Sequence, residues 1–396
     1  MYLKPELIKS RGFGSTAHTV VTDDGYILTV YRMINPRWLT TGAANGIVRP
    51  PRGPVLLWHG MVSSSDTFLF SHRGQLSTST GQYSERNGTL VNDCQLTVTS
   101  NLAFTLSACG YDVWLGNTRG NQYSDKHIDN NYKNYWNYTF TELAIYDLNN
   151  TIDYIRKFTG KSSIAYVGYS MGSTIMLILL SVEPDYQRYL KPVILLGPTA
   201  YMSHTKSLGR LFAPFSYING LTIEAVGEPR AKMQFYGQHV CTNKLLNNIC
   251  NTMNYVYNGY DPNATEPDNE PIAVSKSLQY TSSLLMQQYG QFMLSGRFHR
   301  LDLGPTGNQE MYGQPMAPDY PVELIRSAYL VIISGPNDFF STPLDVRKLV
   351  DKLTVKPLDD YIVPNKYYNH ADFIGSINNY KLVNPRILMW LKMLDV

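Results

Sequence analysis

The sequence has little charge and no marked excess of either sign. Of its 396 residues, 34 are Lys or Arg and 31 are Asp or Glu, which leaves a formal net charge of +3. Proteins that follow a nucleic-acid backbone concentrate positive charge, so the balance argues against a nucleic-acid partner. Hydrophobic residues make up 43% of the chain. That share supports a large buried core and excludes a disordered chain.

A hydrophobic run long enough to cross a membrane is also missing. The most apolar stretch, residues 175–180, belongs to a segment well short of the roughly 20 apolar residues that a transmembrane helix needs. The first residues, Met1-Tyr2-Leu3-Lys4-Pro5-Glu6, lack the apolar core of a signal peptide. We therefore expect no transmembrane anchor, and no signal peptide is visible in this chain.

Cysteine is scarce. The chain has Cys94, Cys109, Cys241 and Cys250, too few for a disulfide scaffold and without the CxxC spacing of a metal site. We expect neither a metal nor a cofactor. Cys241 and Cys250 are close enough in sequence to close a small loop, and we expect this disulfide in an oxidising compartment.

Short Asn-X-Ser/Thr motifs are the other trace of a secretory protein. The glycosylation candidates are Asn87, Asn137 and Asn263, and a further motif starts at Asn149. Each motif is a weak signal because it arises by chance in an Asn-rich chain. Together with the cysteines, they favour a protein of the secretory pathway.

Strand-like and helical patterns alternate along much of the chain. Residues 19–22 and 26–30 flank the turn Asp23-Asp24-Gly25 and predict a β-hairpin. Further strands are expected at 55–58, 111–115, 164–167, 192–196 and 328–333, and helices at 102–109, 141–159, 173–181 and 377–394. Short apolar runs between helices indicate a mostly parallel sheet with helices on both faces.

The alternation stops between residues 201 and 322. This segment is helical and loop-like, with no strand of comparable quality. The sequence therefore predicts one discontinuous core domain, 1–200 and 323–396, interrupted by an inserted cap and lid at 201–322. The polar stretch 71–99 is expected to form a long surface loop.

A nucleophilic serine is indicated by Gly168-Tyr169-Ser170-Met171-Gly172, which fits the pattern G-x-S-x-G. The pattern alone is weak, but here it lies between a predicted strand and a predicted helix, the context that gives it meaning. Both glycines are needed because the turn is so tight that neighbouring Cβ atoms would clash. The alternative is an ordinary glycine-bounded turn with an inert serine.

A serine needs a general base, and in this arrangement the expected order along the chain is Ser, Asp or Glu, then His. The histidines downstream are His204, His239, His299 and His370. The first three fall in the insertion. His370 follows the last predicted strand and precedes the last helix, so we expect it to be the base; a structural histidine is the alternative.

The orienting acid should lie at the end of the preceding strand. Asp338 follows the run 330–333 through a Ser-Gly-Pro-Asn loop, which places its carboxylate at the same sheet edge as Ser170. The rivals are Asp345, in the next helix, and Asp372, better suited to a local cap or charge partner. Acyl transfer also needs oxyanion donors, and we expect the backbone N–H groups of Met171 and Met61. For Met61 the alternative is a plain strand-to-loop turn.

At these motifs the sequence resembles the acid lipase family, the relatives of gastric and lysosomal lipases that include many insect members. The similarity extends over nearly the whole chain. Its most specific segment is the run 110–121, Gly-Tyr-Asp-Val-Trp-Leu-Gly-Asn-Thr-Arg-Gly-Asn, and further matches are Asp23-Asp24-Gly25-Tyr26, Leu57-Trp58-His59-Gly60 and Asn369-His370-Ala371-Asp372-Phe373.

The resemblance implies an α/β-hydrolase fold with a helical cap and lid. It implies a catalytic triad of Ser170, Asp338 and His370, an oxyanion hole at Met61 and Met171, and the Cys241–Cys250 disulfide in the cap. It also implies a secreted or lysosomal location. The chain departs from the family at the elbow, which usually reads Gly-His-Ser-Gln-Gly, whereas Tyr169 and Met171 stand here.

The leading hypothesis is a serine carboxylic ester hydrolase, a lipase that cleaves acylglycerols or sterol esters at a lipid–water interface and acts as a monomer. Apolar segments of the insertion, 211–215 and 284–286, could face lipid or form ordinary cap core. One rival is a catalytically silent lipid-binding protein on the same fold. Another is a hydrolase of thioesters or amides, which the same triad would permit.

Overall fold

A nine-stranded, mostly parallel sheet forms the centre of the protein. The computed structural model describes residues 4–39, 52–69, 74–77, 82–85, 89–91, 96–217, 225–226, 232, 235–243, 246–264 and 279–396. The order of the strands is β1-β2-β8-β3-β10-β11-β14-β15, with β9 pairing to β2. Their bounds are β1 Gly14–Val21, β2 Tyr26–Ile34, β3 Pro54–Trp58, β8 Asp112–Leu115, β9 Lys126–His127, β10 Ile164–Tyr169, β11 Leu190–Leu196, β14 Leu330–Ser334 and β15 Asp359–Ile362.

The strands from β8 to β15 run parallel, whereas β1, β2 and β9 form the antiparallel end. Successive side chains of one strand enter opposite layers of core, as a two-residue period requires. Leu56 and Trp58 of β3 pack in one layer, and Val55 and Leu57 pack in the other. The apolar runs thus correctly predict a mostly parallel sheet that is buried on both faces.

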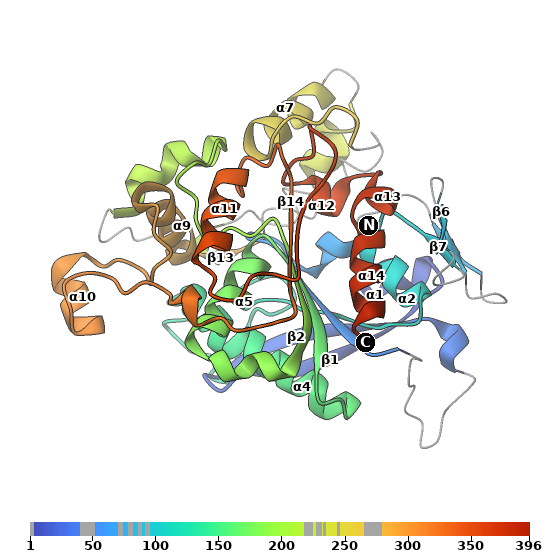
Figure 1. The fold of residues 1–396 in the computed structure, drawn as a ribbon, viewed down its shortest axis with the longest axis horizontal. Coiled ribbons are helices and arrows are strands. Elements are labelled where there is room, and N and C mark those ends of the chain that lie inside the picture. The colour runs from blue at the N-terminus through green and yellow to red at the C-terminus, as the bar shows by residue number, and fades with distance from the viewer. Residues whose placement is uncertain are drawn as a thin grey trace.

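Helices cover both faces of the sheet (Figure 1). One face carries α3 (Phe140–Glu142), α4 (Asn149–Thr159), α5 (Met171–Val182) and α11 (Pro343–Lys352), and the other carries α1 (Lys4–Ser10), α2 (Leu102–Ala108), α12 (Asp372–Gly375), α13 (Asn379–Leu382) and α14 (Asn384–Met393). The helix predicted over 141–159 is observed as three consecutive segments: α3, a π-helix at Leu143–Leu148, and α4. The prediction of one helix over 377–394 is wrong in one respect, because this segment forms two helices, α13 and α14. Pro385 takes the first turn of α14, a position that suits a residue without an N–H.

The expectation of a long surface loop at 71–99 is wrong in part. The described residues of this stretch form the short antiparallel pairs β4 (Gln75–Leu76) with β5 (Tyr83–Ser84) and β6 (Thr89–Val91) with β7 (Leu96–Val98). The ring of Tyr83 is buried against Phe13 and stacks on Phe104 of α2. An aromatic residue in this polar stretch therefore serves as core for the helix layer beside it.

The segment 201–322 contributes no described strand to the main sheet. Its helical elements are η5 (Leu208–Tyr217), η6 (Tyr236–Val240), α7 (Asn247–Asn258), α9 (Ser283–Ser295) and α10 (Gly304–Tyr312), and β12 (Ala225–Val226) pairs only with β13 (Thr281–Ser282). In Figure 1, α7 lies beside the loops that precede α12, and α10 extends away from the rest of the molecule. The prediction that this segment is a separate cap and lid remains a proposal.

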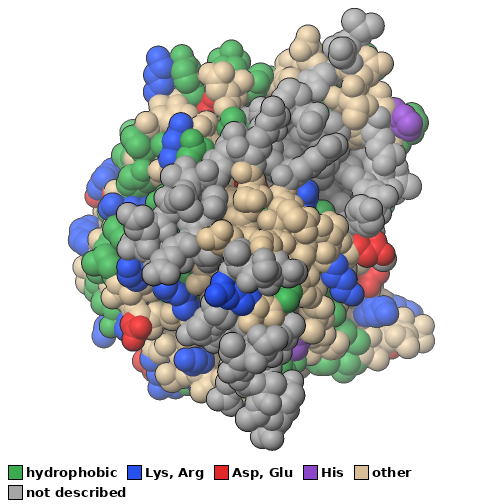
Figure 2. All heavy atoms as spheres, turned by 90° about the vertical axis from the view of Figure 1, so that its right-hand side faces the viewer, with side chains coloured by type: hydrophobic (Ala, Val, Ile, Leu, Met, Phe, Trp, Pro, Cys, Tyr) green, Lys and Arg blue, Asp and Glu red, His purple; other side chains and the backbone are tan. Residues whose placement is uncertain are grey.

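The described surface is mixed in character. On the face that Figure 2 shows, the described Lys and Arg side chains lie dispersed among hydrophobic and other polar groups. Among the described residues, every helix is too short or too polar to traverse a bilayer.

Candidate active site

Ser170 occupies the turn between β10 and α5. Its backbone has φ of +53° and ψ of −114°, an unusual conformation for a residue with a side chain. The Ser170 N–H donates to the carbonyl of Leu196, the last residue of β11, at 2.9 Å. This contact ties the strained turn to the neighbouring strand, and such strain is typical of functional sites.

The two glycines of the motif are required by close packing. A Cβ atom on Gly168 would lie 2.7 Å from the backbone carbon of Gly172, and one on Gly172 would lie 2.5 Å from the carbonyl oxygen of Trp58. Both distances are shorter than real Cβ contacts, and the obstacles are backbone atoms that cannot rotate away. The absence of side chains therefore lets α5 begin directly against the end of β3.

His370 reaches Ser170 from the loop between β15 and α12. Its Nε2 lies 2.8 Å from the Ser170 Oγ, and its Nδ1 lies 2.7 Å from Oδ2 of Asp338. Asp338 follows β14, and its other oxygen accepts the backbone N–H groups of Phe340 and Ser341 at 2.8 and 2.7 Å. The carboxylate is thus an acceptor on every side, so Nδ1 of His370 carries the proton that it donates to Asp338. Nε2 is then free to accept the Ser170 hydroxyl proton.

The side chains of Asp338 and His370 are closely surrounded. Gly197, with φ of +53°, directly follows β11, and a Cβ on it would lie 3.1 Å from Asp338 Oδ2 and 3.3 Å from His370 Cε1. The imidazole packs between the rings of Tyr169 and Phe340, whose centroids lie 5.2 and 5.1 Å from its own. The residues Ser170, His370 and Asp338 are all buried.

The rival histidines of the sequence have other contacts. His204 pairs with Asp345 at 2.9 Å, and His299 contacts the Ser295 hydroxyl at 3.0 Å. His239 is exposed and lies against the ring of Phe235. Among the described histidines, His370 is the one that contacts Ser170.

The rival acids also have local roles. Asp345 accepts the Thr342 hydroxyl at 2.9 Å at the start of α11. Asp372 accepts the N–H of Asn369 at 2.7 Å in the turn before α12, and it does not cap that helix, which has no side-chain cap. Burial raises the pKa of the Asp372 carboxyl well above its ordinary value, and the neighbouring Asp261 adds to the rise.

The loop after β3 brings a second set of backbone N–H groups to the serine. A Cβ on Gly60 would lie 3.3 Å from the Ser170 Cβ, so Gly60, the residue before Met61, packs against Ser170. Met171 is the first residue of α5, at the positive end of the helix dipole. In the described part of the chain, the N–H groups of Met61 and Met171 donate to no protein acceptor.

Sequence reasoning missed the part that His59 plays in this loop. Its Nε2 lies 3.2 Å from the backbone nitrogen of Thr118, which can only donate, so Nε2 carries no proton. The proton is therefore on Nδ1, which donates to the carbonyl of Gly60 at 2.7 Å. The carbonyl of a peptide points away from its N–H, so this bond fixes the direction of the Met61 N–H. The sequence feature that could have indicated this role is the dipeptide His59-Gly60 directly after β3.

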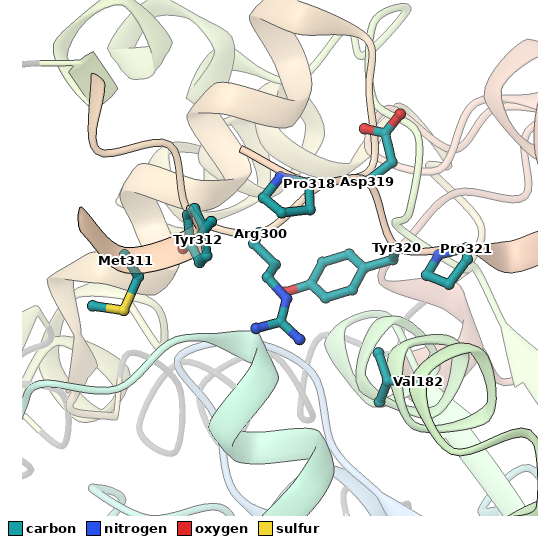
Figure 3. A pocket seen from close by; sticks show the side chains of 8 residues that line it. All are labelled: Val182, Arg300, Met311, Tyr312, Pro318, Asp319, Tyr320 and Pro321. Carbon is teal, nitrogen blue, oxygen red and sulfur yellow. The ribbon is translucent and has the colours of Figure 1, made fainter. Parts of the chain in front are cut away.

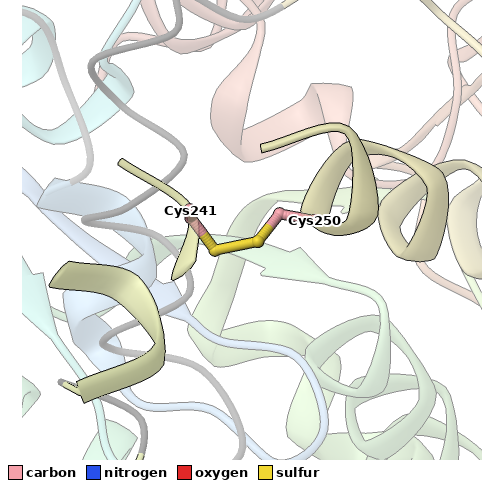
Figure 4. Close-up of a disulfide and its surroundings, with 2 residues drawn as sticks. All are labelled: Cys241 and Cys250. Carbon is pink, nitrogen blue, oxygen red and sulfur yellow. A yellow bond between two sulfur atoms is a disulfide. The ribbon is translucent and has the colours of Figure 1, made fainter. Parts of the chain in front are cut away.

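The other predicted residues lie away from the serine. Cys241, at the end of η6, forms a disulfide with Cys250 of α7, with Cα atoms 5.7 Å apart (Figure 4). Asn137 and Asn263 are exposed, as glycosylation requires. Asn87 and Cys94 lie outside the described residues.

One hollow in the described part of the chain lies away from Ser170 and His370. It has a volume of about 460 Å³ and lies between α10, the end of α5 and the segment 318–321 (Figure 3). Arg300 and Tyr320 project into it. Its lining contains neither Ser170 nor His370.

Exposed apolar side chains gather on one element of the insertion. Leu211, Phe212 and Phe215 of η5 are 67%, 63% and 56% exposed. The segment 284–286 is different, because Leu285 is fully buried and Met286 is partly exposed. Of the two segments that the sequence suggests for contact with lipid, only 211–215 presents a wide apolar surface.

Comparison with known proteins gives two matches to family profiles. The profile of the alpha/beta hydrolase fold matches residues 53–236, and that of a partial alpha/beta-hydrolase lipase region matches residues 4–72. Among solved structures, the chain is similar to a thioesterase domain from the curacin biosynthetic pathway, with a TM-score of 0.50, 12% identity, and coverage of 95% of this chain and 99% of that one. The structure of DcsB in complex with its substrate analogue gives a TM-score of 0.51 at 11% identity, with coverage of 96% and 99%. These matches confirm the predicted α/β-hydrolase fold.

Two relatives are similar in sequence along most of their length. Lipase 3 of Drosophila melanogaster is 32% identical over 400 residues, which cover 97% of this chain and 91% of the relative. Gastric triacylglycerol lipase of Homo sapiens is 31% identical over 379 residues, which cover 94% of this chain and 86% of the relative.

Proposed function

The chain belongs to the acid lipase family of α/β hydrolases, and from that premise we propose that it cleaves fatty acyl esters such as acylglycerols or sterol esters, with Ser170 as nucleophile. The family makes it a lipase-type ester hydrolase. One observation carries the finer proposal: the unbroken contacts of 2.8 Å from Ser170 to His370 and 2.7 Å from His370 to Asp338.

In the proposed acylation step, the Ser170 oxygen attacks the ester carbonyl carbon while His370 Nε2 removes the hydroxyl proton. Asp338 holds the Nδ1 proton and stabilises the imidazolium that forms. The tetrahedral intermediate collapses when the imidazolium gives its proton to the leaving alcohol, which leaves an acyl-enzyme. Water, deprotonated by the same imidazole, then releases the fatty acid and restores the Ser170 hydroxyl.

The charge that develops on the carbonyl oxygen needs fixed donors. The N–H groups of Met61 and Met171 are the candidates, because they border Ser170 and donate to no acceptor in the described part of the chain. Donors fixed before the reaction stabilise the oxyanion without reorganisation. This chain has Tyr169 and Met171 where the family motif has His and Gln, and these side-chain differences leave the backbone N–H groups in place.

Contact with a lipid surface is supported by η5. Its side chains Leu211, Phe212 and Phe215 are exposed, and burial in a lipid phase would remove their apolar surface from water. We assign the segment 201–322 as the cap and lid on this basis. The disulfide between Cys241 and Cys250 favours an oxidising compartment, so we place the protein in the secretory pathway or lysosome.

The test is hydrolysis of emulsified triacylglycerol and cholesteryl ester across pH by the wild type, with Ser170→Ala as control. We expect the substitution to lower kcat by at least about 10⁴-fold, because the nucleophile is lost. An organophosphonate should label the wild type at Ser170 and leave Ser170→Ala unlabelled. Turnover by Ser170→Ala at the wild-type rate would refute the mechanism.

The same assay separates the rivals. A silent lipid-binding protein would bind the esters but would neither turn them over nor react with the phosphonate. A hydrolase of another class would prefer thioesters or amides in a panel with matched acyl chains. Each of these results would replace the proposed substrate class.

A further inference from the structure

The main chain of His370 is hydrogen-bonded on both sides by residues outside the triad. On one side, the hydroxyl of Tyr169 donates to the His370 carbonyl at 3.1 Å. On the other, the His370 N–H donates to the carbonyl of Asn258 at 3.2 Å. Tyr169 belongs to the elbow, and Asn258 ends α7 in the insertion. Two distant parts of the sequence therefore hold the same residue.

Tyr169 connects three loops of the site. It directly precedes Ser170, its ring packs on the imidazole of His370, and its Cε1 lies 3.0 Å from where a Cβ on Gly60 would be. The ring is buried among the side chains of the layer that also holds Phe373. Burial raises the pKa of the Tyr169 hydroxyl well above its ordinary value, and the charges of Asp338 and Asp372 add to the rise. The hydroxyl therefore keeps its proton and acts as a donor.

The turn after α7 provides the opposite side. The carbonyl of Asn258 accepts two N–H groups, from His370 and from Phe339, each at 3.2 Å. Phe339 directly follows Asp338, so a single oxygen joins the loop of the base to the loop of the acid. The next carbonyl, that of Gly259, accepts the side-chain N–H of Asn369 at 2.8 Å.

The fit of this turn depends on glycine. Gly259 has φ of +113°, a conformation that side chains rarely adopt. A Cβ there would lie 2.2 Å from the carbonyl oxygen of Asn337 and 3.0 Å from the Cβ of Asn369. One residue further, the carbonyl of Tyr260 accepts the side-chain N–H of Asn337 at 2.9 Å. Three consecutive carbonyls of the insertion thus bind residues next to Asp338 or His370.

We propose that Tyr169 and Asn369 are positioning residues that hold the catalytic base between the elbow and the 258–260 turn of the insertion. The inference rests on the proposed function, because it assumes that His370 is the base. Its physical reason is that proton transfer depends steeply on geometry, and a displacement of about 1 Å can cost about 100-fold in rate. The hydroxyl of Tyr169 donates to the His370 main chain and the side chain of Asn369 donates to the 258–260 turn, so both act through His370.

The experiment compares Tyr169→Phe and Asn369→Ala with two matched controls. Tyr169→Phe keeps the ring and removes only the hydroxyl. Its control is Tyr320→Phe, another buried tyrosine, whose hydroxyl contacts Thr141 at 2.7 Å. Asn369→Ala removes the donor to Gly259. Its control is Asn308→Ala, a buried asparagine that donates to Asp302 and Pro315 beside α10.

For each protein, kcat and KM on a dissolved short-chain ester, the rate of phosphonate labelling and the melting temperature are measured. We expect Tyr169→Phe and Asn369→Ala each to lower kcat by about 3- to 10-fold, the equivalent of one hydrogen bond. The labelling rate should fall in proportion, and KM should stay within about twofold because substrate binding is unaffected. The controls should lower the melting temperature without changing kcat.

The inference is overturned if Tyr169→Phe keeps the wild-type kcat and labelling rate, or if its loss appears in KM alone. Should Asn369→Ala fail to fold, Tyr169→Phe still decides. Failure of the proposed function has a different signature, since the wild type itself would then neither turn over esters nor react with the phosphonate.

Discussion

The imidazole of His59 donates a hydrogen bond to the carbonyl oxygen of the residue that follows it, Gly60, at 2.7 Å. Its other nitrogen accepts the N–H of Thr118, so the ring is neutral and its orientation is fixed. This bond sets the plane of the Gly60–Met61 peptide, and with it one of the two proposed oxyanion donors.

Replacement of His59 by Ala should therefore lower kcat more than it raises KM. Loss of a whole oxyanion donor costs about 10²- to 10³-fold, and misorientation of one should cost less, about 10-fold. Affinity for a transition-state analogue should fall in parallel with kcat. His299→Ala is the control, because His299 is also buried and its Nδ1 lies 2.6 Å from the carbonyl of the next residue, Arg300. Equal loss of kcat in both variants would contradict a specific role for His59.

Gly172→Ala should abolish most activity and weaken folding. The added Cβ would meet the carbonyl oxygen of Trp58 at 2.5 Å, so α5 and β3 would have to separate. Such overpacking costs about 1–3 kcal/mol of unfolding free energy and would displace Ser170 from His370. Gly209→Ala is the control, since its nearest new contact would be at 3.6 Å. Urea unfolding and kcat measure the two effects, and a fully active Gly172→Ala would refute the packing argument.

Apolar side chains of η5 should matter only at a lipid surface. Phe212→Asp should lower the rate on emulsified triacylglycerol by about 10-fold or more, because burial of a Phe side chain in lipid contributes about 1.5–3 kcal/mol. Its rate on a dissolved ester should be unchanged. Leu344→Asp on α11 is the control, since Leu344 is similarly exposed outside the insertion. A loss on both substrates, or the same loss in Leu344→Asp, would remove η5 from the lipid contact.

An ion pair at the edge of the sheet should make stability depend on pH. Partial burial of the Asp359 carboxyl would raise its pKa, but hydrogen bonds from Arg386 and Trp390 of α14 and the charge of Arg386 outweigh this effect and lower it. A group whose pKa is lowered by folding contributes stability above its unfolded pKa, near 3.9, and this contribution is lost as pH falls through the folded value. Asp359→Asn should thus cost about 1 kcal/mol at pH 7, and less as the pH falls below the unfolded pKa.

Thermal melts of Asp359→Asn and the wild type across this range would test the sign. The difference between the two melting temperatures should shrink as the pH falls. Asp351→Asn is the matched control, because Asp351 is exposed and lies 4.0 Å from Arg347. A difference that grows towards low pH would contradict the assignment.

The residues of the proposed triad could be predicted because each lies in the turn or loop that follows a strand of the parallel sheet. Ser170, Asp338 and His370 follow apolar runs, and the carboxyl ends of parallel strands share one edge. The contacts of Tyr169 and Asn258 could not be predicted in this way. Tyr169 and His370 are 201 positions apart, and their hydrogen bond depends on backbone geometry that no local pattern encodes.

The burial of Tyr83 could not be predicted either, because the rings it contacts, Phe13 and Phe104, lie in other segments of the sequence. The division between α13 and α14 had a local signal in Pro385, which favours the first turn of a new helix. An apolar pattern read as one long helix obscured that signal. Local chemistry thus located the strand ends, whereas the packing between distant segments came only with the fold.

The helix α7 is held near both ends. Near its start, Cys250 forms the disulfide with Cys241, and at its end the carbonyl of Asn258 accepts hydrogen bonds from the loops of Asp338 and His370. This arrangement bears on chimeric enzymes. An insertion transplanted from a relative to change substrate preference would arrive with its own turn after α7, and the recipient histidine loop would lose its matching carbonyls. Residues 258–260, Asn337 and Asn369 should therefore be exchanged as a set, because a graft that matches only the ends of the insertion would leave the loop of His370 without these hydrogen bonds.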